Sequence, residues 1–185
     1  MPEKTEGGFC WHQSEFTPFG WCPDFEKRLK NIKETAPQDI CNRLIVLFKP
    51  VRGQIPEEVV RAKQLHLEAM QAYHKAREAD EEAIQTHKGS ITTHNMTWKA
   101  YQEAPPENKE ILKQKYEKSK NDCFDAKERQ QQTQQAHNKA SKICIESVRN
   151  YKKVLAKHIE TIEALHRKEC PECPWNGRAI FSEVV

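Results

Sequence analysis

The residues with the clearest capacity for chemistry are two cysteines near the carboxyl end of the chain. Cys170 and Cys173 are separated by Pro171 and Glu172. Thiolates at this spacing can both bind one tetrahedral metal ion, and a glycine-containing turn beyond them, here at Gly177, is typical of zinc knuckles. A tetrahedral zinc ion takes four ligands, so other parts of the chain would have to complete the site.

Four residues elsewhere could complete such a site: Cys10, His12, Cys22 and His166. Cys10 and Cys22 give the simplest set. One hypothesis is therefore a structural zinc ion bound by Cys10, Cys22, Cys170 and Cys173. A single pair of cysteines more strongly favours two thiols that bind nothing in a loop. A redox pair is the least favoured of the three because no βαβ pattern surrounds the motif.

The cysteine content also bears on the cellular compartment of the protein. The chain has seven cysteines, and Met1 to Gly20 contains acids, proline and glycine where an export signal would have an apolar run. We therefore expect reduced thiols and a cytoplasmic protein. The longest apolar run, Leu44 to Phe48, is too short to span a bilayer. Association with a membrane surface or the cytoskeleton stays open.

No pattern indicates an enzyme. The sequence contains no phosphate-binding loop, no nucleophile elbow and no HExxH motif. Adjacent carboxylates such as Glu81 and Glu82 point in different directions on a helix, so they form no acid–base pair. Histidines such as His66 and His87 occupy repeat positions that tyrosine and cysteine also fill, which favours a packing role. We expect a non-enzymatic protein with no cofactor other than the zinc ion.

The most regular feature is a seven-residue repeat in two long polar segments, Glu57 to Glu103 and Glu107 to Glu169. Each segment has one line of larger side chains and one line of small ones. The larger line of the first segment is Val59, His66, Tyr73, Asp80, His87, His94 and Tyr101. Its small line is Ala62, Ala69, Ala76, Ala83, Ser90 and Thr97. The second segment repeats the scheme from Tyr116 to Leu165 and from Leu112 to Thr161. Small residues on such a seam let two helices approach closely.

A short proline turn joins the two segments. Ala104 precedes Pro105 and Pro106, so the first helix should end there and the second should begin at Glu107. A turn this short makes the helices antiparallel neighbours. Between Thr86 and Thr97 the residues are poor helix formers, but the repeat keeps its phase, which favours a continuous helix. The fold class is therefore all-α, a long antiparallel coiled-coil hairpin.

The predicted boundaries follow from these patterns. Residues 1–23 are expected to form an irregular aromatic arm, because glycines and prolines interrupt them. Residues 24–55 should hold two short helices and a connector, 56–169 the helical hairpin, and 170–185 the tail with the two cysteines. The short helices should begin after Asp24, which can cap the first, and after Pro37.

Charge distinguishes the two long helices. Charged residues make up 31% of the chain, the formal net charge is +3, and the mean hydropathy is −0.90. The second segment carries most of the excess of basic residues, which could contact an anionic surface. Its candidate contacts are Lys139, Lys142, Arg149, Lys152, Lys153 and Lys157. The alternative is an ordinary solvated coiled-coil exterior. Nucleic-acid binding is less favoured, since only Tyr151 interleaves the basic residues.

Two stretches resemble the tip region of F-BAR domains. They are Ala72-Tyr73-His74-Lys75-Ala76-Arg77-Glu78-Ala79-Asp80-Glu81-Glu82-Ala83 and Lys113-Gln114-Lys115-Tyr116-Glu117-Lys118-Ser119. The resemblance covers the middle third of the chain. F-BAR modules are longer, with another long helix ahead of the tip, and lack cysteine-rich ends. The resemblance implies a dimer that binds anionic membranes through lysine and arginine.

These observations lead to three functional hypotheses. The first is a coiled-coil scaffold that forms a homodimer or docks a helical protein partner, at an anionic lipid surface or the cytoskeleton. The second is a zinc-stabilised adaptor that recognises proteins through its cysteine-rich ends. The third is nucleic-acid binding through the basic helix.

Overall fold

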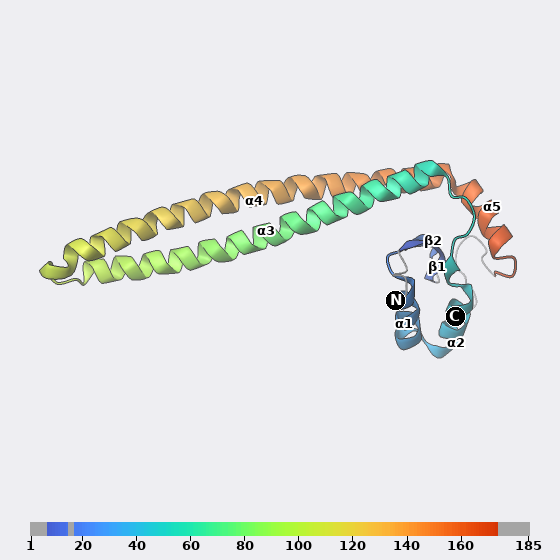
Figure 1. The fold of residues 1–185 in the computed structure, drawn as a ribbon, viewed down its shortest axis with the longest axis horizontal. Helices are drawn as coiled ribbons and strands as arrows, with labels where there is room; N and C mark the ends of the chain where they lie inside the picture. The colour runs from blue at the N-terminus through green and yellow to red at the C-terminus, as the bar shows by residue number, and fades with distance from the viewer. Residues whose placement is uncertain (1–6, 15–16, 174–185) are drawn as a thin grey trace, which may run out of the picture. The chain divides into compact units, whose positions relative to one another are not determined.

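The computed structural model describes residues 7–14 and 17–173 (Figure 1). The chain divides into two compact units. Unit 1 combines two segments that are distant in sequence, Met1–Pro56 and His158–Val185, and unit 2 is the intervening Glu57–Lys157. None of the described helices contains a stretch apolar and long enough to cross a bilayer.

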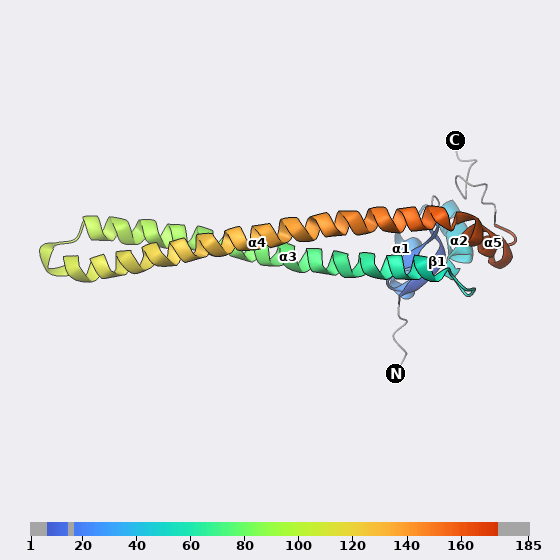
Figure 2. The same ribbon diagram turned by 90° about the horizontal axis from the view of Figure 1, so that it is seen from above.

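Unit 2 is an antiparallel helical hairpin, as the repeat predicts. Helix α3 spans Glu57–Gln102, a 3-10 turn, η1, spans Pro106–Asn108, and α4 spans Lys109–Lys157. The helices lie side by side along their lengths in both ribbon views, and they cross in the second (Figure 2). Helix α3 is continuous through Thr86 to Thr97, which confirms the expectation from the repeat phase.

The seam of the hairpin is filled by the small line of residues. Ala69 and Ala83 of α3 are buried, as are Ser119 and Ala126 of α4. Polar contacts cross the seam at intervals and fix the antiparallel register. The hydroxyls of Thr97 and Ser119 are 2.6 Å apart, Nδ1 of His87 is 2.5 Å from Oε1 of Gln130, and Nδ1 of His66 is 3.2 Å from the hydroxyl of Ser147.

Unit 1 contains a small sheet that corrects the expected irregular arm. Strands β1 (Gly8–Ser14) and β2 (Thr17–Cys22) form an antiparallel pair, and β3 (Lys49–Pro50) joins β1 to give the order β2-β1-β3. The physical reason is an alternation with a period of two residues. Phe9 pairs with Trp21 and Trp11 with Phe19, so the rings gather on one face and the intervening residues lie on the other.

The two short helices of unit 1 confirm the sequence prediction. Helix α1 spans Phe25–Thr35 and α2 spans Gln38–Leu47. The carboxylate of Asp24 accepts a hydrogen bond of 2.9 Å from the backbone N–H of Lys27, so Asp24 caps α1 as expected. Together with the sheet, these helices enclose an apolar core. Its buried members are Cys10, Cys22, Ile32, Cys41, Leu44 and Phe48.

The second long helix ends earlier than its repeat predicts. Helix α4 stops at Lys157, and a separate helix, α5, spans Ile159–Glu169. His158 between them has φ −106° and ψ 13°, outside the usual helical range. The repeat continues past this point, but Ile162 and His166 are buried in unit 1 instead of in a hairpin seam. The predicted boundary at residue 169 therefore moves to residue 157.

Candidate metal centre

The candidate centre begins with an unusual backbone conformation at His12. Its φ is 53°, and among the described residues no other non-glycine residue has a positive φ. The pairing of β1 with β2 shifts register between Trp11 and Ser14. A histidine in this left-handed region costs free energy on the order of 1 kcal/mol or more. Side chains two positions apart on a regular strand lie on the same face, so His12 would be expected beside Cys10. The irregularity interrupts this alternation, and the side chain of His12 lies against α5 instead of in the apolar core with Cys10.

Three ligand-type side chains meet at this point. Nε2 of His12 is 2.9 Å from Nε2 of His166 and 3.3 Å from Sγ of Cys173. The three ligand atoms lie within 4.8 Å of one another. His12 is fully buried and His166 is 6% exposed, while Cys173 is partly exposed. The Nδ1 atom of His12 is buried without a hydrogen-bond partner, so the polar contacts of this ring are made through Nε2.

The surroundings keep both imidazoles neutral near pH 7. Burial lowers the pKa of His12 to about 4, assisted by the nearby His166 and Lys49. Burial also lowers the pKa of His166, with a smaller contribution from Lys49. A neutral imidazole has one nitrogen lone pair free to accept a proton or a metal ion. Two neutral imidazoles and a thiol are a donor set that suits zinc, cobalt and copper.

The second cysteine of the motif lies in the same turn but outside this group. The backbone N–H of Cys173 donates to the carbonyl oxygen of Cys170 over 3.1 Å. Cys170 is buried, which raises the pKa of its thiol, and the neighbouring Lys49 opposes that effect. The backbone of Cys170 is thus tied to that of Cys173, while the thiol of Cys170 forms a hydrogen bond with Lys49.

The carboxylate of Glu169 fixes the end of α5 beside the cluster. It accepts hydrogen bonds from Nε1 of Trp11 at 2.8 Å, from the backbone N–H of Arg52 at 3.1 Å and from the backbone N–H of Gly53. Nζ of Lys49 donates to the carbonyl oxygen of Glu169 at 2.6 Å. The first strand, the connector after β3 and α5 are therefore held together next to His12 and His166.

The structure does not bring the four predicted sulfurs together. Cys10 and Cys22 lie in the apolar core, where Sγ of Cys10 contacts the carbonyl oxygen of Gly20 at 3.5 Å. Burial raises the pKa of the Cys10 thiol to about 12, and the neighbouring Cys22 adds to that effect. The expected partners of Cys173 are thus replaced by His12 and His166. No local pattern marks the backbone irregularity at His12 that selects it.

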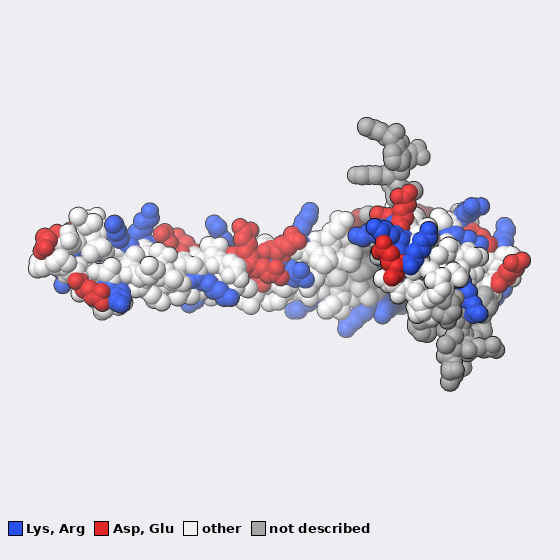
Figure 3. Space-filling view, turned by 90° about the horizontal axis from the view of Figure 1, so that it is seen from below, with Lys and Arg blue, Asp and Glu red and all other residues white. Residues whose placement is uncertain are grey.

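The predicted anionic-surface residues all lie exposed on α4. They are Lys139, Lys142, Arg149, Lys152, Lys153 and Lys157. Lys157 pairs with the carboxylate of Glu58 at 2.7 Å. On the face drawn in Figure 3, basic and acidic side chains are interspersed along the hairpin. The basic residues are therefore accessible, and acidic side chains lie among the charges of that face.

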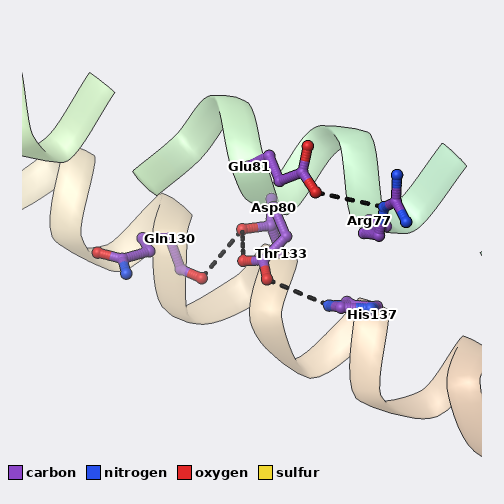
Figure 4. Close-up of polar contacts among 6 residues, drawn as sticks. All are labelled: Arg77, Asp80, Glu81, Gln130, Thr133 and His137. Carbon is purple, nitrogen blue, oxygen red and sulfur yellow. Dashed lines mark hydrogen bonds and ion pairs between the residues drawn. The ribbon is translucent and has the colours of Figure 1, made fainter. Parts of the chain in front are cut away.

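A second buried polar group lies in the hairpin (Figure 4). Asp80 of α3 is 8% exposed and points toward α4, where Oγ1 of Thr133 and Nδ1 of His137 each lie 3.2 Å from one of its carboxylate oxygens. Arg77 and Glu81 pair with each other on the surface of α3. Asp80 therefore forms a buried polar link between α3 and α4, in addition to the polar contacts described above.

Together, the fold and the cluster define a helical hairpin inserted in the sequence of a small mixed unit that carries a histidine–cysteine group. Comparison of the chain with known protein families, curated proteins and solved structures found no match.

Proposed function

We propose that this protein is a non-catalytic interaction scaffold in which a structural zinc ion stabilises unit 1 and the helical hairpin of unit 2 presents the contact surface. The observation that carries the proposal is the meeting of His12, His166 and Cys173. The proposed occupant of this cluster is a zinc ion. Its ligands would be the two Nε2 atoms and the Cys173 thiolate.

The spacing of the three atoms suits a zinc ion after a small expansion. Zinc lies about 2.0–2.1 Å from histidine nitrogen and about 2.3 Å from cysteine sulfur, so tetrahedral ligands are separated by about 3.3 Å for two nitrogens and about 3.6 Å for nitrogen and sulfur. The corresponding separations here are 2.9 Å and 3.3 Å. Side-chain movements of a few tenths of an ångström would accommodate the ion.

Burial supports a structural role over a catalytic one. A catalytic zinc ion keeps an open position for water or substrate, whereas both imidazoles here are withdrawn from solvent. The cluster also joins residues that are 154 and 161 positions apart in the sequence. A cross-link over so long a loop restricts the unfolded chain and stabilises the folded one.

Cobalt substitution tests the proposal directly. Co²⁺ added to metal-stripped protein should bind with one equivalent per chain and give the visible spectrum of a tetrahedral ion with a thiolate charge-transfer band. His166→Gln should weaken binding at least tenfold, and Cys173→Ser should reduce the charge-transfer band. Cys123→Ser, which removes a thiol of the hairpin, is the matched control and should bind as the natural protein does.

The same titration decides between ligand sets. If Cys170→Ser reduces the charge-transfer band as Cys173→Ser does, Cys170 is the fourth ligand. If it has no effect, a water molecule or another group completes the site. Loss of binding in Cys10→Ser and Cys22→Ser, with His166→Gln unaffected, would contradict the proposal and restore the four-sulfur set. Folded natural protein that binds neither Co²⁺ nor Zn²⁺ would also overturn it.

A second candidate function is contact with anionic membranes, as the F-BAR resemblance implies. The exposure of the basic residues on α4 favours it. Sedimentation with phosphatidylserine vesicles at low salt should capture the protein, and salt should release it. Lys152→Glu with Lys153→Glu should reduce capture, and Lys27→Glu with Lys30→Glu, in exposed positions of α1, is the control. Absence of binding at low salt would exclude this function.

A further inference from the structure

One face of the hairpin near its turn carries a cluster of aromatic rings. The ring of Trp98 lies 4.8 Å from that of Tyr116 and 5.9 Å from that of Tyr101, and the two tyrosine rings stack on each other. His94, one turn before Trp98 on α3, stacks on Tyr116 at 5.2 Å. Trp98 is nevertheless 40% exposed. The cluster therefore holds an indole ring in place while leaving part of it open to solvent.

A groove of about 330 Å³ lies beside this cluster. Its lining residues are His94, Lys120, Asn121, Cys123, Phe124 and Lys127. Phe124 is 61% exposed, so its ring adds a second aromatic surface at the groove. Nδ1 of His94 is buried without a hydrogen-bond partner. The groove thus combines apolar walls with two ammonium groups, a side-chain amide and an unsatisfied ring nitrogen. This combination suits a flat ligand that has polar edges.

A line of lysines on α4 follows the same face. The lysines recur at spacings of four and seven residues and are all exposed, namely Lys109, Lys113, Lys120 and Lys127. Nζ of Lys109 lies 6.0 Å from the ring centroid of Tyr101, and Lys120 and Lys127 line the groove. From its first to its last member the line is about 27 Å long, at about 1.5 Å per residue. A row of positive charge therefore borders the aromatic surface.

Acidic side chains border this face without entering the groove. None of the six lining residues is acidic, and residues 88–99 of α3 include two lysines and no acid. On α4, helical spacing places Glu117 and Glu128 beyond Phe124, on the side away from α3. Glu117 lies 4.0 Å from Lys120, at the limit of an ion pair. The face is therefore complementary in charge to a polyanion.

We propose that this basic and aromatic face binds single-stranded nucleic acid. Proteins that bind single strands combine positive charge along the phosphates with aromatic side chains on which successive bases stack. Here the phosphates would follow the lysine line, and bases would stack on Trp98 and Phe124. Trp98 comes from α3 and the lysines come from α4, so the complete pattern forms only when the two helices pack together.

The groove favours a polynucleotide over a lipid surface. A lipid surface contacts protruding side chains and leaves a hollow between helices unfilled, whereas an unstacked base has the flat shape and polar edges that the groove accepts. His94 and Asn121 supply a ring nitrogen and an amide for those edges. In a duplex the bases are stacked on one another, so their faces cannot reach Trp98 or Phe124. The face lies within unit 2, so the proposal does not depend on metal binding in unit 1.

Fluorescence anisotropy with a labelled oligothymidylate of about 20 nucleotides tests the role of charge. The natural protein should bind at low salt, and three neutralised phosphates predict a slope of about −2 for log affinity against log salt concentration. Lys120→Gln with Lys127→Gln should weaken binding at least tenfold and reduce the slope by about 1.4. Lys115→Gln with Lys118→Gln is the matched control, because both lysines are exposed and lie on the other side of α4. It should keep the natural slope.

The same assay tests the rings. Phe124→Ala and Trp98→Ala should each lower the affinity about fivefold or more, the loss expected when a base loses its stacking partner. Ile111→Ala removes a side chain that is 59% exposed on the other side of α4, and it should bind as the natural protein does. An abasic oligonucleotide of the same length should bind at least fivefold more weakly than oligothymidylate. Circular dichroism should show the same helix content in all variants.

Three results would overturn the proposal. The first is folded natural protein that does not bind oligothymidylate at low salt. The second is equal affinity for the abasic and the natural oligonucleotide, which would show that charge acts alone. The third is capture by phosphatidylserine vesicles that is lost in Phe124→Ala and in the Lys120 and Lys127 variant, without oligonucleotide binding. That result would assign the face to a lipid surface.

Discussion

Nε2 of His12 faces Nε2 of His166 at 2.9 Å, although the two residues are 154 positions apart in the sequence. Only one of these nitrogens can carry a hydrogen between them when both rings are neutral. A metal ion that binds both lone pairs would replace this single hydrogen bond by two coordinate bonds. An ion bound here would therefore tie β1 to α5 within unit 1.

Removal of metal should lower the Tm of the natural protein and leave the Tm of the ligand variants nearly unchanged. A ligand that binds only the folded state at a thousand times its dissociation constant stabilises by about 4 kcal/mol. For a chain of this size, that corresponds to a fall in Tm of about 8–16 °C when a chelator is added. Differential scanning calorimetry should show this shift for the natural protein and little shift for His12→Gln. A chelator shift of equal size in both proteins would contradict the assignment.

The metal-free protein should lose stability in mildly acidic solution. The pKa of His12 is lowered from an ordinary value near 6.5 to about 4. Between these values the unfolded chain takes up a proton that the folded protein rejects, so the free energy of unfolding falls as the pH drops from about 6.5 to about 4. Urea unfolding of chelated protein across this range should show the trend, and His12→Gln should weaken it. The groups that face His12 are His166, Lys49 and Cys173. An unchanged slope in His12→Gln would assign the effect to other residues.

Asp80→Ala should destabilise the hairpin. The substitution removes the carboxylate contacted by Thr133 and His137 and leaves both side chains without that partner in the seam. We expect a loss of about 1–3 kcal/mol in the free energy of unfolding, and a smaller loss for Asp80→Asn, which keeps an acceptor oxygen. Urea unfolding followed by circular dichroism measures both. Glu82→Ala, in an exposed position two residues away, is the control and should change stability by less than about 0.5 kcal/mol.

Gly89→Ala should stabilise the hairpin. Gly89 lies in the interior of α3, and an added Cβ would meet no atom within 4 Å. Alanine has the higher helix propensity and restricts the unfolded chain, so the gain should be about 0.4–1 kcal/mol. Gly53→Ala should instead lower the stability, because the added Cβ would overlap the side chain of Leu165 and come too close to Glu169. Thermal unfolding that shows no gain for Gly89→Ala would indicate that α3 is not continuous there in solution.

The sequence alone determines the hairpin. The seven-residue repeat and the proline turn depend on neighbours a few positions apart, and such local periodicity survives in the structure as the seam from Ala62 to Ala126. The repeat cannot locate the end of the hairpin, because a helix with a suitable apolar face keeps the same pattern whichever partner buries it. Ile162 and His166 continue the helical spacing and yet belong to unit 1.

Only the tertiary structure decides the candidate site. The pair of cysteines marks the region, but Cys10 and His12 are two positions apart on one strand, and nothing local shows which of them meets Cys173. The positive φ of His12 and the hydrogen bonds of Glu169 to Trp11, Arg52 and Gly53 settle the choice. These contacts join segments at the two ends of the chain, and the packing that forms them arises only when both ends of the chain fold together.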